Sequence, residues 1–408
     1  MSGANVIKRL PVESLRVGMF ITDLNNDWIP HNQQRRRGFI RRDETIAGIH
    51  KLGAQYVYID TDKGLDSSDA EPASEVDQKN EAALQAAGEW APSDVKSRAL
   101  DEEMGRAREV HGQAQSLVDN LMQDVKLGKA VDVLPIQDLA HNLKESVLSN
   151  PNALSALGRI RQKDNYLLEH SVNLSVLMSV FGQGLGLSHD VMEEIIVGAL
   201  LHDIGKILTP DEILNKPGKL SDREFKVMKE HAAHSRDILM NSEGVGELTL
   251  LTAAEHHERL DGTGYPAGLT GEEISQYGRM AAIADVYDAI TADRAYHKGI
   301  TPTQGLKRLL EWSGDHLDPN LVREFIRCLG IYPIGTVVQL DSARLGVVVE
   351  TNPDDMRLPV LQLFYSTQYG QPITIEKMDL AAPGTQDRIL RAIDPRDHNL
   401  DIRRVMAL

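Results

Sequence analysis

The sequence predicts an α+β protein with several domains: a central helical bundle, a small strand-containing region before it and a small β extension after it. The chain has 408 residues, which is enough for two or three domains and a sizeable core. Helical spacing of apolar residues dominates from about 154 to 330, whereas short apolar runs bounded by Pro and Gly occur on either side. We therefore expect domains at 1–135, 136–335 and 336–408.

Composition limits the partners and the compartment. The net charge of −16 and the pI near 5.3 argue against a nucleic-acid polymer or a membrane surface as the partner. The single cysteine, Cys328, excludes a disulfide within the chain and suits a reducing compartment. No window approaches the roughly 20 consecutive apolar residues of a membrane span, and the sequence shows no secretory leader. We expect a cytoplasmic protein with no membrane span.

The first part of the chain predicts a small α/β domain. Short strands are expected within 6–23 and at 55–60, with a short helix from Glu44 to Leu52. Residues 61–98 are rich in Asp, Glu, Ser and Ala and poor in large apolar residues, which predicts a mobile acidic linker. No clustered catalytic residues occur in 1–135, so a regulatory role is expected.

A longer helix is predicted at 100–126. Val110, Leu117, Leu121 and Val125 lie along one of its faces. This face could pair with a second copy and form a homodimer, or it could pack on its own domain. The sequence leaves both alternatives open.

Histidines and aspartates recur at the ends and on the faces of the predicted central helices. His202-Asp203 follows an apolar helical pattern, and His256-His257 ends another. A lone His-Asp pair is compatible with a histidine satisfied by its neighbours, but one buried polar residue on each of several helices is what a metal site in a bundle needs. The candidate ligands are His170, His202, Asp203, His231, His256, His257 and Asp285.

The donor set indicates the kind of metal. Imidazole and carboxylate ligands suit Mn, Fe or Zn, and two ions about 3.5–4 Å apart can clamp a phosphodiester for in-line attack. Lys206 could contact a phosphate, or it could merely stabilise the C-terminal dipole of its helix. His234 follows His231 at a chelating spacing, but enough donors are already present, so we expect a residue that is not a ligand.

These residues resemble a known family. His202-Asp203, with His170 before and Asp285 after, looks like the HD metal-dependent phosphohydrolase superfamily. Four further motifs resemble those of its HD-GYP subfamily. These motifs are His202-Asp203-Ile204-Gly205-Lys206, His256-His257-Glu258, Asp261-Gly262 and Gly264-Tyr265-Pro266. The resemblance covers roughly 150–335 and implies a helical bundle that hydrolyses cyclic diguanylate. The N-terminal segment is similar to a small domain of unclear role often found ahead of HD-GYP domains.

The resemblance also implies residue roles. One ion would be held by His170, His202, Asp203 and Asp285, and Asp203 would bridge to a second ion held by His231, His256 and His257. Lys206 would assist the phosphate chemistry together with Asp203, and the candidate nucleotide contacts are Asp261, Tyr265, Arg294 and Lys298. Some family members hold a third ion through a Glu four residues before the first His; that position is Tyr166 here, so two ions, Fe or Mn, are expected.

The expected reaction is opening of cyclic diguanylate to the linear dinucleotide, possibly continuing to GMP. Two alternatives stay open: an effector without catalysis that binds a nucleotide or a protein through the loop at 258–266, and a phosphodiesterase for another cyclic dinucleotide. An effector would be expected to lack a ligand or the lysine, and none is missing.

The last part of the chain predicts a small β extension. Short apolar runs at 335–340, 345–350 and 360–365 indicate three strands with no evident chemistry. Residues 380–408 are too mixed in composition to assign.

Overall fold

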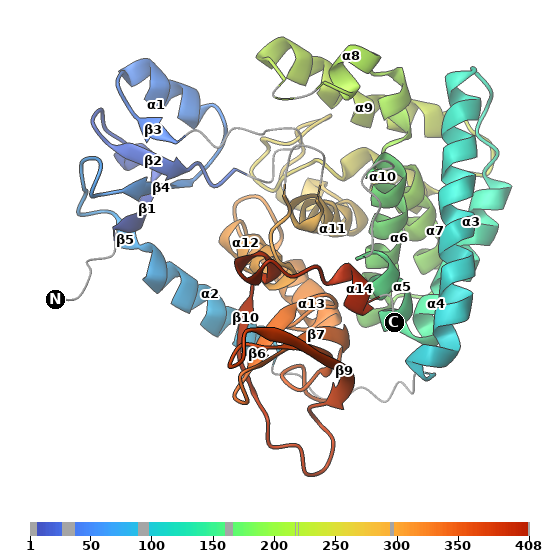
Figure 1. The fold of residues 1–408 in the computed structure, drawn as a ribbon. Helices are drawn as coiled ribbons and strands as arrows, with labels where there is room; N and C mark the ends of the chain where they lie inside the picture. The colour runs from blue at the N-terminus through green and yellow to red at the C-terminus, as the bar shows by residue number, and fades with distance from the viewer. Residues whose placement is uncertain are drawn as a thin grey trace.

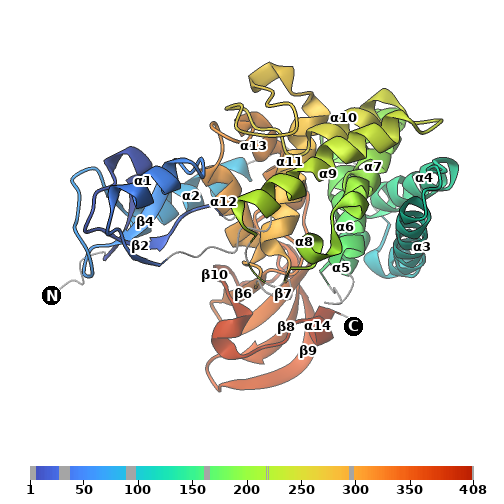
Figure 2. The same cartoon turned by 90° about the horizontal axis from the view of Figure 1, so that it is seen from above.

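The computed structural model describes residues 6–26, 37–88, 98–159, 166–216, 218, 220–293 and 298–406. Figures 1 and 2 show a small sheet at the N-terminal side, a helical bundle, and a second sheet below the bundle. Each sheet has its own apolar cluster, and the bundle contains the largest one. The predicted α+β multidomain class is confirmed.

The N-terminal sheet is built from short strands in the order β3-β2-β4-β1-β5. Leu10, Ile21, Val57 and Ile59 are buried on it, and α1 (Asp43–His50) contributes Ile49 to the same core. The apolar residues of β1, β2 and β4 explain why strands are predicted within 6–23 and at 55–60, whereas the two-residue strands β3 and β5 were not predicted. The strands are β1 (Ile7–Pro11), β2 (Phe20–Asp23), β3 (Gly38–Phe39), β4 (Tyr56–Asp60) and β5 (Glu71–Pro72).

The predicted mobile linker is wrong for much of its length. Helix α2 (Ala73–Ala87) occupies the middle of the acidic segment and extends from the N-terminal sheet toward α12 and α13 (Figure 1). Its few apolar residues share one face: Val76, Leu84 and Ala87 are buried, and the last two belong to the core of the bundle. Composition alone missed this helix because a few correctly spaced apolar residues are enough once a docking surface exists.

The predicted helix at 100–126 is present as α3 (Leu100–Lys126), and it packs on its own bundle. Val110, Ala114 and Val118 are buried in contact with the neighbouring helices. Leu121 is buried as well, so much of the face that could have paired with a second copy is already covered. Pairing of two copies through this helix stays an untested prediction.

The bundle surrounds an apolar core in which α6 is almost completely enclosed. Side chains cap two of the helix starts: Ser188 caps α7, and Ser221 with Glu224 forms a capping box on α9. The other helices of the bundle are α4 (Leu134–Ser149), α5 (Pro151–Leu157), α6 (Tyr166–Gly184), α7 (His189–Leu201), α8 (Asp211–Leu214), α9 (Asp222–Met240), α10 (Glu247–Glu255), α11 (Gln276–Thr291), α12 (Pro302–Glu311) and α13 (Pro319–Leu329).

The C-terminal sheet has the order β10-β6-β7-β8-β9, and all pairings are antiparallel. Its three expected strands are confirmed, and two more were not foreseen. Strand β9 is mostly exposed and so lacks an apolar pattern. The strands are β6 (Val337–Leu340), β7 (Arg344–Glu350), β8 (Val360–Ser366), β9 (Gln371–Asp379) and β10 (Ile389–Ile393), followed by the short helix α14 (Arg403–Met406).

Hydropathy along the helices bears on membrane insertion. Among the described residues, no helix combines the length and the apolar character that crossing a membrane requires.

Docking of α2 can be tested at Leu84, whose side chain is fully buried. We expect Leu84→Ala to lower the free energy of unfolding by about 2–5 kcal/mol, measured by urea denaturation. The substitution removes most of a buried leucine side chain and leaves a cavity in its place. Leu65→Ala is the matched control from the same acidic segment, since Leu65 is 54% exposed, and its effect should stay within about 0.5 kcal/mol. Equal, small effects of both changes would contradict an ordered, docked α2.

Candidate metal centre

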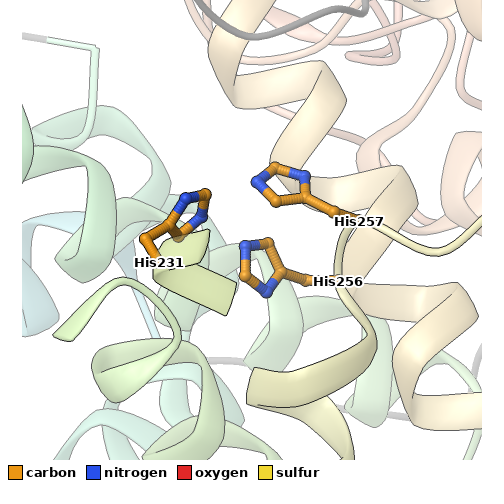
Figure 3. Close-up of side chains that lie close together, drawn as sticks. All are labelled: His231, His256 and His257. Carbon is orange, nitrogen blue, oxygen red and sulfur yellow. The ribbon is translucent and has the colours of Figure 1, made fainter. Parts of the chain in front are cut away.

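All seven predicted ligands meet inside the bundle. His170 lies on α6, His231 on α9 and Asp285 on α11, whereas the His202-Asp203 and His256-His257 pairs follow the last residues of α7 and α10. Figure 3 shows His231 facing His256 and His257 from the opposite side of the site. Three triads have ligand atoms within 4.8 Å of one another, and they are His170/His202/Asp285, His202/Asp203/His256 and His231/His256/His257.

A close helix contact brings two of these groups together. A Cβ atom on Gly205 would lie 2.1 Å from the His231 carbonyl oxygen and 2.4 Å from the Ser235 nitrogen. The Gly205 amide also donates a hydrogen bond to Ser235 Oγ at 2.9 Å. Glycine at 205 therefore allows the segment after Asp203 to lie directly against α9, which carries His231.

Three histidines have the same hydrogen-bond arrangement. The Nδ1 atom of His202 lies 2.7 Å from the Ala199 carbonyl oxygen, that of His231 2.6 Å from Met228, and that of His256 2.8 Å from Ala253. Since a carbonyl can only accept, each Nδ1 carries the proton and each Nε2 presents a lone pair.

Those lone pairs point to a cation site. The Nε2 atoms of His202, His231 and His256 are buried and have no hydrogen-bond partner among the described residues, and the same is true of Asp203 Oδ1. Leaving buried acceptors without a donor is costly unless a cation satisfies them. Histidines fixed through their other nitrogen are also the usual form of metal ligand. The residues therefore fit bound metal ions.

Asp203 lies between two sets of histidines. Its Oδ2 atom is 3.1 Å from His202 Nε2 and 3.8 Å from His170 Nε2. Its Oδ1 atom is 3.3 Å from His231 Nε2 and 4.0 Å from His256 Nε2. Each carboxylate oxygen thus faces a different set, which is the arrangement that a bridging ligand needs.

Lys206 lies beside the same carboxylate. It is 7% exposed, lies on the 3₁₀ turn Ile204–Leu208, and donates a hydrogen bond from Nζ to Asp203 Oδ2. Burial raises the pKa of Asp203, but His202 and Lys206 outweigh this effect and hold it well below its usual value. The carboxylate is therefore charged at neutral pH.

His170 is held by two carboxylates of α11. Its Nε2 lies 3.0 Å from Asp285 Oδ1 and its Nδ1 lies 2.8 Å from Asp288 Oδ2. Asn173, one turn further along α6, donates a hydrogen bond to the other oxygen of Asp288. Burial lowers the pKa of His170, yet the two carboxylates together raise it to about 9. Asp285 favours a proton on His170 Nε2, and a metal ion bound at this nitrogen would take the place of that proton.

His231, His256 and His257 are neutral near pH 7. Burial, together with nearby cationic groups, lowers the pKa of His231 to about 3 and that of His256 to about 4. Burial likewise holds the pKa of His257 well below its usual value. Neutral imidazole is the form that binds metal, so these side chains need lose no proton before binding an ion.

The loop after His257 is folded over this cluster. Glu258 accepts hydrogen bonds from three backbone amides, those of Ala267, Gly268 and Leu269, at 2.7, 3.1 and 3.0 Å. The Tyr265 amide donates to the His257 carbonyl at 3.1 Å, and the Tyr265 ring lies 4.6 Å from the His257 ring. Tyr265 is thus placed directly beside the ligand cluster, next to the cis peptide that joins it to Pro266.

The other candidate contacts are less close to this cluster or lie outside the described residues. Asp261 accepts hydrogen bonds from Thr263 within the loop, and Lys298 lines a 410 Å³ cavity that includes none of the seven ligands. Arg294 and the side chain of Tyr166 lie outside the described residues. His234 is in none of the three triads.

Several residues that support the site were not foreseen. Asp288 and Asn173 orient His170, Ser235 holds the turn after Asp203, and Glu258 folds the Tyr265 loop. The sequence offered one signal for Asp288, because it lies three residues after Asp285 and so shares its helix face. Asn173 and Ser235 bond to residues on distant segments, whereas Glu258 bonds to backbone amides 9–11 residues later in its own loop, and helix or strand spacing indicates none of these pairings.

A matched pair of substitutions tests the choice of histidine on α9. We expect His231→Ala to lower the number of bound metal ions, measured by elemental analysis of the purified protein, because a buried Nε2 ligand is removed. His234→Ala should leave the metal content unchanged. Loss of metal from the His234 variant alone would show that the wrong histidine was assigned.

Asp288 can be tested for its effect on His170. Asp288→Asn keeps the shape but loses the charge that orients the imidazole, so we expect metal affinity to fall about 10–100-fold. Competition with a chromogenic chelator measures this. Asp293→Asn, on the same segment but outside the triads, is the control; equal loss in both variants would argue against the assigned role of Asp288.

Comparisons with known proteins agree with this geometry. The HD domain family profile matches residues 150–321, and a domain of unknown function, DUF3391, matches residues 7–136. A cyclic di-GMP phosphodiesterase of Pseudomonas aeruginosa is 38% identical over 386 residues, covering 94% of this chain and 92% of that protein.

Two further relatives match about half of this chain. The cyclic di-GMP phosphodiesterase response regulator RpfG of Xanthomonas campestris is 34% identical over 54% of this chain and 59% of its own length. A 3'3'-cGAMP-specific phosphodiesterase of Vibrio cholerae is 36% identical over 45% of this chain and 34% of its own length. Taken with the ligand pattern, these likenesses show that the chain belongs to the HD-GYP subfamily of the HD domain phosphohydrolases.

Proposed function

We propose that this protein is a metal-dependent phosphodiesterase that hydrolyses cyclic diguanylate. The observation that carries the proposal is the set of buried Nε2 atoms of His202, His231 and His256, which have no hydrogen-bond partner in the described part of the chain and surround the charged carboxylate of Asp203. The similarity over 92% of a relative named cyclic di-GMP phosphodiesterase supports this substrate.

Two divalent ions, Fe or Mn, fit the donor set best. His170, His202 and Asp285 would hold one ion, His231, His256 and His257 would hold the other, and Asp203 would contribute one oxygen to each. When bound, such ions lower the pKa of water and neutralise charge on a phosphodiester. The absence of Cys from all three triads favours these metals over thiophilic ones.

The neighbouring side chains would hold the substrate. Lys206 is the only lysine or arginine side chain paired with Asp203 among the described residues, and its ammonium group would bind a phosphate oxygen near the ions. Tyr265 would contact the nucleotide from the loop above His257. Asp261, Arg294 and Lys298 are further proposed substrate contacts.

The product and the exact nucleotide belong to the same proposal. Opening of the ring to the linear dinucleotide would come first, with possible continuation to GMP. A relative specific for 3'3'-cGAMP keeps another cyclic dinucleotide as the second candidate substrate. An effector without catalysis, acting through a protein partner at the 258–266 loop, is less favoured because both the ligands and Lys206 are present together.

The deciding experiment compares substrates on metal-loaded protein. Protein loaded with Mn or Fe would be incubated in parallel with cyclic diguanylate, 3'3'-cGAMP and cyclic di-AMP, and the products separated by chromatography. We expect the fastest turnover with cyclic diguanylate and none in Asp203→Ala, which loses the bridging ligand. Tight nucleotide binding without turnover under any metal would instead support the effector.

Lys206 can be separated from the metal ligands. We expect Lys206→Ala to retain its metal ions but to lower kcat by about 10²-fold or more, because a preorganised charge near the phosphate is lost. Lys216→Ala is the control, since Lys216 pairs with Glu224 outside the centre. Full activity of the Lys206 variant, or loss of its metals, would contradict the proposed role.

A further inference from the structure

The N-terminal domain grips α12 through the turn that follows β2. Arg308 of α12 donates to Asp23 Oδ2 from Nη2 and to Asn25 Oδ1 from Nη1, each at 2.7 Å. The Asn25 amide donates back to Asp23 Oδ1 at 2.9 Å, which closes the turn. Two residues of one turn therefore engage both ends of a single guanidinium group.

The Asn25 side chain also bonds to a second residue, Trp312, which lies in the interior of the bundle. Its Oδ1 atom also accepts a hydrogen bond at 3.2 Å from the indole Nε1 of Trp312, the residue that ends α12. Asn25 is 3% exposed and so is Trp312. Asn25 has a φ of 49°, a left-handed conformation that costs most residues energy. The residue with this unfavourable backbone conformation is the one whose side chain bonds to Arg308 and Trp312 of the bundle.

Trp312 forms part of the wall behind the metal ligands. A cavity of 30 Å³ is lined by Trp312 together with His256, His257, Glu258 and His316, among others. A cavity of this size leaves little room for the indole to move without changing what it packs against. Trp312 is therefore the side chain that connects Asn25 of the N-terminal domain with the cavity beside the ligands His256 and His257.

The segment after Trp312 also holds the loop that carries Tyr265. The His316 amide donates to the Trp312 carbonyl at 3.2 Å, and the His316 carbonyl accepts from the Leu260 amide at 3.3 Å. His316 Nδ1 lies 3.3 Å from Asp261 Oδ2. Asn25, Trp312 and His316 thus form a continuous series of contacts from the N-terminal domain to the start of the loop.

We propose that Asn25 is a positioning residue for the substrate site: through Trp312 and His316 it fixes the loop at 258–269 over the metal ligands. The inference rests on the proposed function for its kinetic consequence but not for its structural one. It gives the N-terminal domain a defined effect, because undocking of that domain would release the loop and weaken nucleotide binding without removing a metal ligand.

Other contacts of the same interface end on different residues. Tyr58 Oη donates to Glu311 at 3.2 Å, and Lys307 pairs with Asp77 and Glu81 of α2 at 2.8 and 2.9 Å. None of these residues lines the cavity behind His256 and His257. A variant at Asp77 therefore removes one polar contact of the interface without touching Trp312, and Lys307 keeps its pairing with Glu81, so it serves as the matched control.

The experiment uses the full-length, metal-loaded protein and two readouts. Asn25→Gly removes the acceptor and tolerates the positive φ, whereas Asn25→Asp keeps an acceptor oxygen. Trp312→Phe keeps an aromatic ring but loses the indole donor. Amide hydrogen exchange of residues 258–269 reports the loop, and KM and kcat report the site.

We expect Asn25→Gly and Trp312→Phe each to speed exchange of 258–269 and to raise KM by about fivefold, the scale of one net hydrogen bond, while kcat and metal content stay within about twofold. The double variant should show no larger change in exchange rate or KM than each single variant shows. Asn25→Asp should keep the wild-type exchange rate and the wild-type KM. Asp77→Asn should leave both unchanged.

Two results would overturn the inference: exchange of the loop unchanged in both Asn25→Gly and Trp312→Phe, or equal acceleration in Asp77→Asn. If the wild-type protein hydrolyses no cyclic dinucleotide, the proposed function fails, yet the exchange readout still decides whether Asn25 positions the loop. The two failures can therefore be told apart.

Discussion

The structure of the site depends on one buried charge, the carboxylate of Asp203. A charged carboxylate with almost no exposure is costly unless cations and donors surround it. Here Lys206 supplies one cation, and histidines from α6, α7, α9 and α10 surround the rest. The helices are held in register around this group, since a shift of any one would leave the charge without its partners.

Helix ends solve a second problem, which is the orientation of the ligands. The last carbonyl groups of a helix have no amide donor from the next turn. At the ends of α7 and α10 the carbonyls of Ala199 and Ala253 receive instead the Nδ1 protons of His202 and His256. One hydrogen bond thus satisfies the helix end, selects the tautomer and directs Nε2 into the site. His231 uses the same bond within α9, where the Met228 carbonyl has a lone pair to spare.

The metal ligands could be predicted from the sequence, but the residues that support and orient them could not. Four of the seven ligands form the adjacent pairs His202-Asp203 and His256-His257 at helix ends, and the other three could be predicted as polar residues on apolar helices and from the resemblance to the family. Asp288 and Ser235 act on residues that only the fold brings close, and Glu258 acts on the backbone of its own loop, whose conformation local spacing does not predict. The same reason explains α2: Leu84 and Ala87 are unremarkable in an acidic segment, and only the surface of α12 and α13 makes them core residues.

The ordering of α2 changes how the N-terminal domain relates to the site. A mobile linker would let that domain act only by proximity, because a flexible chain transmits no defined geometry. A helix docked on α12 and α13, together with the 23–25 turn on Arg308, fixes the domain against the same helix that ends in Trp312. The interface combines polar contacts at Arg308 and Lys307 with the buried Leu84 and Ala87 of α2. We propose that the docked domain acts on the loop at 258–269 through this fixed geometry rather than through proximity alone.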